Sequence, residues 1–135
     1  MRKYLLVIPL LVLVLACATW KENIVTTYEG IGDTMQVTRD AMISACASGL
    51  IDANSCETLK TQYNKVEVLR IRAGDVLADL IVIDESLKIV TDMAKKNELL
   101  VQKDITLARY NALINDLNHL LQDLIKVAKE TGVKL

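Results

Sequence analysis

The side chain best suited to bind a metal or to act as an acid or base is the one histidine of this chain, His119, which follows Asp116 by three positions. An acid and a histidine at this spacing can share a metal ion in a helical bundle, but a two-metal site needs a second such histidine and more carboxylates. No serine stands in a Gly-x-Ser-x-Gly elbow, and Gly30-Ile31-Gly32 lacks the third glycine of a dinucleotide-binding turn. The sequence therefore predicts no catalytic, cofactor-binding or metal-binding residues, and no enzyme.

The N-terminus has the pattern of a secretory signal peptide. Met1-Arg2-Lys3 carries two positive charges, and an apolar run follows from Tyr4 to Ala16. This run of about 13 residues is shorter than the roughly 20 that a helix needs to cross a bilayer. The pattern therefore favours a cleaved signal over a retained transmembrane anchor.

The segment Val14-Leu15-Ala16-Cys17 resembles the lipobox of bacterial lipoproteins. A branched apolar residue stands three before the cysteine and a small residue directly before it, although Leu15 replaces the smaller residue that is usual there. The resemblance implies a signal peptide of residues 1–16, cleavage before Cys17, a diacylglycerol on its thiol and a fatty acid such as palmitate on its new amine. The alternative is Ala16-Cys17-Ala18, a small-x-small site for ordinary signal peptidase.

Lipidation would place the chain in the cell envelope. Its acyl chains would bind the membrane with ~0.8 kcal/mol per buried methylene. Ala18 after the cysteine, rather than Asp, resembles proteins sorted to the outer membrane of a Gram-negative host, facing the periplasm. The 16 basic and 17 acidic residues give a net charge of −1. This balance provides no attraction to nucleic acid.

Cys46 and Cys56 are the remaining thiols, and an exported chain meets an oxidising compartment in which they would pair. Gly49 is suited to end one helix, and Asn54 with Glu57 forms a capping pair for the next. The two cysteines then face each other across the corner of an antiparallel hairpin. We expect a disulfide there that stabilises the fold by roughly 2.5 to 3 kcal/mol.

The composition predicts an all-α fold. Aromatic residues make up 4% of the chain, and the single proline is Pro9. After a short tether of residues 17–23, we expect one helical domain over 24–135, either an antiparallel three-helix bundle or a long helical hairpin with coiled-coil-like packing. Apolar or small residues recur at three-four spacing, in three sets. They are Ile24, Tyr28, Ile31, Met35, Thr38, Met42 and Ala45; Leu59, Tyr63, Val66, Leu69, Ala73, Leu77, Leu80, Ile83, Leu87, Val90 and Ala94; and Leu100, Leu107, Tyr110, Ile114, Leu117, Leu121, Leu124 and Ala128.

The second corner is expected at Lys95-Lys96-Asn97, and the third helix should end near Gly132. Pairing the first two helices then sets Trp20 beside about residue 82 and leaves the second corner ~20 Å beyond it. The helical segment near that point carries apolar side chains on every side, so it needs packing partners all round. We expect an interface with a second copy or an envelope protein, formed by Trp20, Leu80, Ile81, Val82 and Ile83. The alternative is a second helix that breaks at Gly74 or Asp84 and folds back.

The same pairing brings polar and small residues together between the first two helices. Asp33 would lie near Arg70, where an ion pair could fix the register of the two helices. The alternative is that Arg70 extends its charge into solvent. Tyr28 would lie beside Gly74, placing a ring against bare backbone.

The sequence thus favours a membrane-anchored envelope lipoprotein that acts as a structural, assembly or adaptor subunit through its helix faces. One alternative is an inhibitor, immunity or exclusion factor that blocks another envelope protein. Another is a soluble, secreted helical protein. No domain family suggests itself for residues 20–135.

Overall fold

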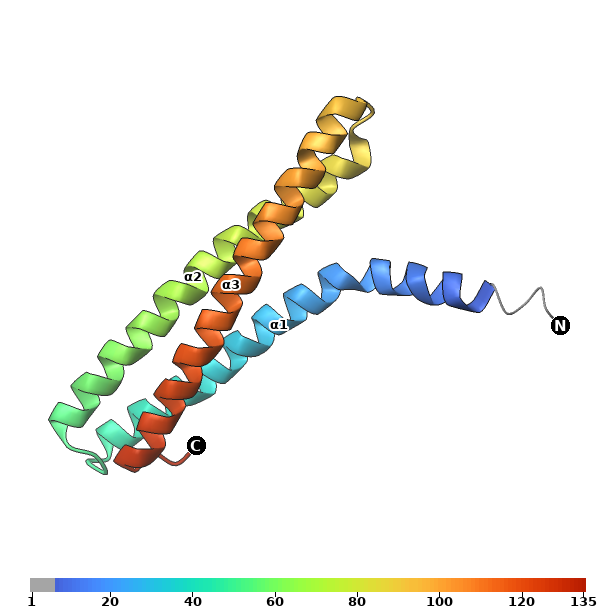
Figure 1. Ribbon diagram of the computed structural model, residues 1–135. Helices are drawn as coiled ribbons and strands as arrows, with labels where there is room; N and C mark the ends of the chain where they lie inside the picture. The colour runs from blue at the N-terminus through green and yellow to red at the C-terminus, as the bar shows by residue number, and fades with distance from the viewer. Residues whose placement is uncertain (1–6) are drawn as a thin grey trace.

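The computed structural model consists of three long α-helices, α1 (Val7–Ala47), α2 (Ala53–Ile89) and α3 (Met93–Thr131) (Figure 1). It describes the backbone of residues 7–135 and the side chains of residues 20–135. No strand occurs in this part of the chain. The prediction of an all-α, three-helix fold is therefore confirmed, whereas residues 1–6 of the predicted signal peptide and the side chain of Cys17 lie outside what is described.

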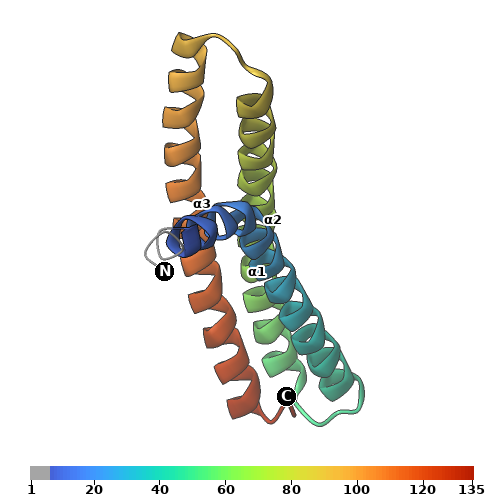
Figure 2. The ribbon, with the colours of Figure 1, turned by 90° about the vertical axis from the view of Figure 1, so that its right-hand side faces the viewer.

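The helices form an antiparallel hairpin with a third helix laid against part of it. α2 and α3 run side by side along their lengths and share the most extensive interface (Figures 1 and 2). α1 contacts both of them from the α1–α2 corner as far as Lys21 and Trp20, which meet Glu85 on α2 and Lys103 on α3. The part beyond these contacts, residues 86–102 with the α2–α3 corner, is built from two helices within the described residues. We call it the projecting hairpin.

The core lies between the three helices at their shared end. Every position predicted for the first helix is buried or half-buried, including Thr38, whose hydroxyl donates to the carbonyl of Thr34 at 2.8 Å. In the projecting hairpin, two predicted core positions are instead exposed, Ala94 and Leu100. α3 begins at Met93, so these two residues lie in its first turns, which α1 does not reach.

The α1–α2 corner is closed by a glycine and a buried isoleucine. Gly49 has φ +72°, its amide donates to Cys46, and the amide of Leu50 donates to Ala45. This pair of bonds is the Schellman end expected for a glycine at this position. Gly132 ends α3 in the same way, as predicted, and it lies against the buried side chain of Ile51.

The cap of α2 is not the residue that the sequence predicted. Asp52, not Asn54, caps α2, because its carboxylate accepts from the amide of Ser55 at 2.7 Å. Asp92 caps α3 through the amide of Lys95 at 2.9 Å. The second corner therefore spans residues 90–92 rather than Lys95 to Asn97.

α2 is continuous, so it does not break at Gly74 or Asp84. Residues 17–23, expected as a tether, form part of α1. Lys21 lies level with Glu85, and α2 ends at Ile89. The second corner thus projects about 8 Å beyond that contact rather than ~20 Å.

The cap of α2 can be tested with two neighbouring variants. We expect Asp52→Ala to lower the thermal midpoint by about 4 °C, because an amide at the start of α2 loses its acceptor. Asn54→Ala should leave the midpoint near that of the wild type, which circular dichroism would measure. An Asn54→Ala effect as large as that of Asp52→Ala would contradict this assignment.

Candidate functional site

The place where α1 meets the middle of the hairpin carries a cluster of charged and aromatic side chains. Lys103 on α3 donates to Asp84 on α2 at 2.8 Å, and its ammonium lies 4.2 Å from the centre of the Trp20 ring on α1. Lys21 donates to Glu85 at 2.7 Å. These contacts join all three helices, and we call the residues Trp20, Lys21, Asp84, Glu85 and Lys103 the junction.

The junction has an interior and a rim. The Asp84 side chain is 14% exposed and that of Lys103 is 22% exposed, so solvent screens their ion pair less than it screens exposed pairs. Glu85 and Lys88 are more exposed, and pairs of that kind contribute little to stability. The Trp20–Lys103–Asp84 stack therefore does most to hold this part of α1 against the hairpin.

Glu85 is the junction residue with the strongest change in acidity. Hydrogen bonds from Lys21 and then from Lys88 lower the pKa of Glu85 from 4.5 to about 2. Its carboxylate therefore stays charged at pH values well above 2.

Two tyrosines form a second layer of contacts toward the shared core. The hydroxyl of Tyr110 on α3 donates to the carbonyl of Ile24 at 3.1 Å, and that of Tyr28 donates to the carbonyl of Arg70 at 3.2 Å. Burial, and then the charge of Tyr28, raises the pKa of Tyr110 to about 12. Each hydroxyl meets a backbone carbonyl of a neighbouring helix, which fixes where α1 lies along the hairpin.

The predicted ion pair between Asp33 and Arg70 does not form. The Arg70 guanidinium instead turns toward Gly32 and lies 5.1 Å from the centre of the Tyr28 ring. Its Nε is buried without a hydrogen-bond partner. Because Asp33 is exposed, water already solvates its carboxylate, while the open space above Gly32 admits the planar guanidinium.

Tyr28 does lie beside Gly74, as predicted. A Cβ at Gly74 would come 2.5 Å from the Tyr28 hydroxyl. A glycine in mid-helix costs up to about 1 kcal/mol, so its presence here is explained by this close approach.

The predicted interface is mostly covered by the protein itself. Leu80 is buried, Ile81 packs against the cluster of Val76, Leu77 and Tyr110, and Ile83 is half-buried. Trp20 is half-buried at the junction. Val82 is 64% exposed and is the only one of the five predicted residues that is available to a partner.

A larger apolar surface that includes Val82 was missed by sequence reasoning. On the solvent side of α2, exposed apolar residues follow one another at intervals of three, four or seven residues, with Asp75 occupying one of these positions. Residues at such intervals share one face of a helix. We call this face the outer stripe: Val68, Ile71, Ala78, Val82 and Ile89. Its signal was present in the sequence as a second heptad, but the stronger apolar periodicity of the buried side concealed it.

Shallow grooves accompany the outer stripe on the side of α3. Val68 lines a groove of about 470 Å³ with Leu69 and Leu120, and Val82 lines one of about 320 Å³ with Ile105. The apolar surface therefore continues from the stripe into the space between α2 and α3.

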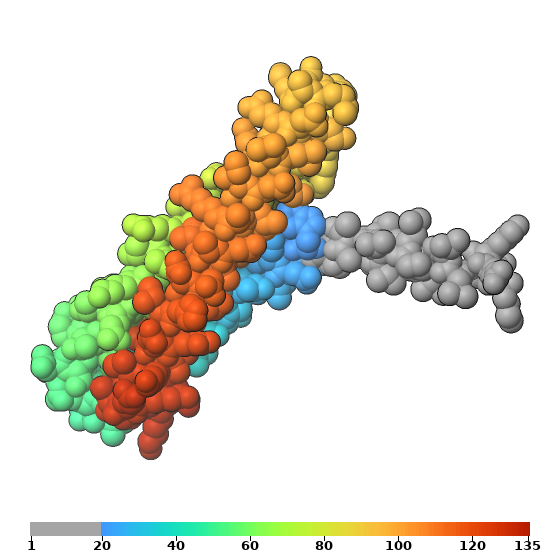
Figure 3. Space-filling model, viewed as in Figure 1, coloured from blue at the N-terminus to red at the C-terminus, as the bar shows by residue number. Residues whose placement is uncertain are grey.

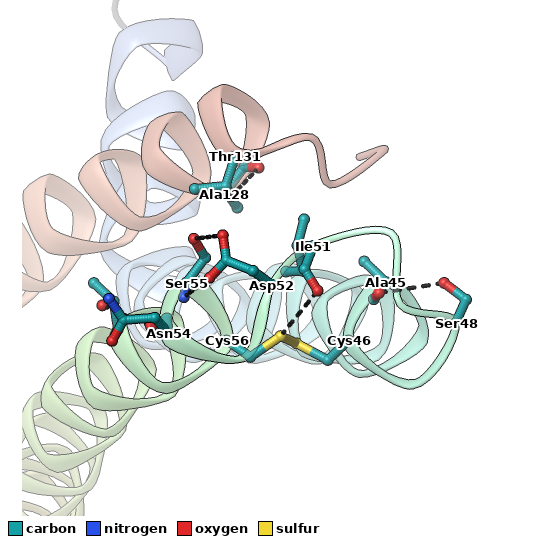
Figure 4. The surroundings of a disulfide bond; sticks show 11 residues. Ala45, Cys46, Ser48, Ile51, Asp52, Asn54, Ser55, Cys56, Ala128 and Thr131 are labelled. Atoms are coloured by element: carbon teal, nitrogen blue, oxygen red, sulfur yellow. Dashed lines mark hydrogen bonds between the residues drawn. A yellow bond between two sulfur atoms is a disulfide. The ribbon is translucent and has the colours of Figure 1, made fainter.

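The disulfide joins Cys46 in the last turn of α1 to Cys56 in the first turn of α2, with 5.9 Å between their Cα atoms (Figure 4). This confirms the predicted pairing at the first corner. An open groove of about 750 Å³ runs beside it between α1 and α2. Its floor includes Met42 and Tyr63, and its rim carries charges of both signs, such as Arg39 and Glu57.

His119 is exposed on α3, and across the described side chains no group of three or more His, Cys, Asp or Glu residues could hold a metal ion. No helix in the described part of the chain has an apolar segment long enough to cross a membrane.

Comparisons with protein-family models, with curated proteins and with solved structures find no match to this chain.

The close approach of Tyr28 to Gly74 can be tested with matched glycines of α1 and α2. Gly30→Ala should raise the free energy of unfolding by roughly 0.5 to 1 kcal/mol, because nothing lies within 4 Å of its Cβ position. Gly74→Ala should lower it by about 1 to 2 kcal/mol, because Tyr28 must move and lose its bond to Arg70. Urea unfolding measures both values, and equal stabilisation by the two variants would contradict the contact.

The acidity of Glu85 tests the junction. Its folded pKa is lowered, so its contribution to stability is present above pH 4.5 and is lost as the pH falls toward 2. Carboxyl NMR should give a midpoint near 2 in the wild type. Lys21→Met should move this midpoint toward 4.5, whereas Lys134→Met, on the exposed C-terminal tail, should not. A wild-type midpoint near 4.5 would show that the junction is open in solution.

Proposed function

We propose that this protein is a membrane-anchored envelope lipoprotein that acts as a structural, assembly or adaptor subunit by binding other proteins through its helix faces. The observation that carries the proposal is the projecting hairpin, which presents large apolar side chains to solvent. Ile89 and Val101 are each more than half exposed there, and Val82 and Ile105 are more than half exposed at its base. Exposed apolar surface of this extent is typical of sites that bind proteins or membranes.

The position of Cys17 supports an anchoring role. It lies three residues before Trp20 on the same helix, which is less than one turn. Acyl chains on Cys17 would therefore attach close to the junction, and the junction holds α1 against α2 and α3 through Lys21 and Lys103. A lipid anchor at this point would keep the projecting hairpin near the membrane surface.

The shape of the molecule supports binding by the hairpin. The space-filling view shows the α2–α3 corner standing clear of α1 (Figure 3). The Asp92 cap of α3 stiffens the outer end of this arm, and the contacts of Lys103 with Asp84 and Trp20 hold its base. A stiff arm beside a membrane anchor is suited to holding a partner at a fixed distance from the membrane.

Intact-mass measurement on the full chain expressed in a Gram-negative host tests the anchor. We expect the mass of residues 17–135 plus a diacylglycerol and a third acyl chain, partition into the detergent phase, and a gain of about two protons on reduction of the disulfide.

Cys17→Ser is the matched control, and it should lose the acyl mass. An unacylated, water-soluble wild-type chain that begins at Thr19 would contradict the proposal and favour cleavage at Ala16-Cys17-Ala18.

A further inference from the structure

We propose that the outer stripe of α2 binds the same stripe of a second copy of this chain, with the two helices antiparallel. The inference rests on the proposed function, in which helix faces bind proteins, and gives one of these faces its partner. The stripe has the three-four spacing of a coiled-coil seam and extends about 32 Å from Val68 to Ile89.

The charge of Asp75 determines the direction of pairing. Asp75 is exposed in the middle of the stripe, at the position between Ile71 and Ala78. In a parallel pair it would face Asp75 of the second copy, and like charges at the centre of a seam are destabilising. In an antiparallel pair it faces Ala78 instead, and the small alanine leaves room for water around the carboxylate.

This antiparallel register also aligns apolar and charged groups. With the twofold axis between residues 76 and 77, Ile71 packs against Val82 of the second copy. Along one side of the seam, Arg72 then lies beside Asp79 of the second copy, and symmetry repeats this ion pair. Arg72 and Asp79 are exposed, and neither forms an ion pair within 4.0 Å in the described chain.

The ends of the register are more polar. Val68 faces Glu85 of the second copy, and Ile89 faces Asn64. The central layers therefore supply most of the affinity, and the dimer should depend on protein concentration. The exposed stripe of α3, which includes Val101 and Ile105, has no pair of opposite charges beside it. An antiparallel pair of this stripe would set Gln102 beside Arg109 and Asp104 beside Asn111 of the second copy.

A charge exchange tests the pairing. The full chain, purified in density-matched neutral detergent, is analysed by sedimentation equilibrium. We expect a monomer–dimer equilibrium whose dissociation constant rises roughly tenfold or more in Arg72→Asp and in Asp79→Arg. The double variant Arg72→Asp/Asp79→Arg should restore the wild-type constant, because each ion pair is re-formed with its signs exchanged. Asp104→Arg on α3 is the matched control and should not change it.

Cross-linking tests the direction. Ala78→Cys should cross-link to itself with a short bismaleimide, since the two symmetry-related positions lie about 4.5 Å apart along the axis. Ile89→Cys should not, because its two copies are about 37 Å apart along the axis.

A wild-type chain that stays monomeric, a double variant that does not recover, or efficient cross-linking of Ile89→Cys would each overturn the proposal. A dimer formed by an unacylated chain would contradict only the anchor, so the two failures are distinguishable.

Discussion

A helix with apolar residues on more than one face needs a neighbour on each of them, and this requirement organises the whole molecule. α2 is buried by α3 on one side and by α1 on another, but the contacts of α1 with the hairpin end at the junction. Beyond the junction, Ile89 and Val101 remain exposed. The protein is thus a three-helix core that continues as a two-helix arm.

Two fixed points hold α1 in this arrangement. At one end, the disulfide between Cys46 and Cys56 ties α1 to the start of α2. At the other end, Trp20 stacks on Lys103, which in turn binds Asp84. The first point is covalent and the second depends on charge. Added salt therefore weakens the junction more than the disulfide.

The sequence predicted those features that depend on periodicity and spacing. Apolar positions of α1 from Ile31 to Ala45 are buried as expected. The helical period determines which residues share one face, and only the apolar face can pack against two other helices. The disulfide and the Gly49 corner followed from the same argument, since both lie at a turn whose ends must be close.

Features that depend on competition between neighbouring residues were not predictable. Asp52 and Asn54 are both good caps, and the choice of Asp52 depends on where the chain leaves the Gly49 turn. Arg70 could pair with Asp33 or lie over Tyr28, and only the three-dimensional packing gives the second. The outer stripe carries a heptad of its own, yet its exposure depends on which side of α2 the other helices cover.

Residue-resolved hydrogen exchange in dilute solution tests the division into core and arm most directly. We expect amides of residues 66–80 and 110–128 to exchange only through global unfolding, and those of 86–102 to exchange much faster through local opening. The buried residues of α2 and α3 lie in the first two ranges. Uniform protection along α2 and α3 would contradict this division, because it would mean that the arm is as fully packed as the core.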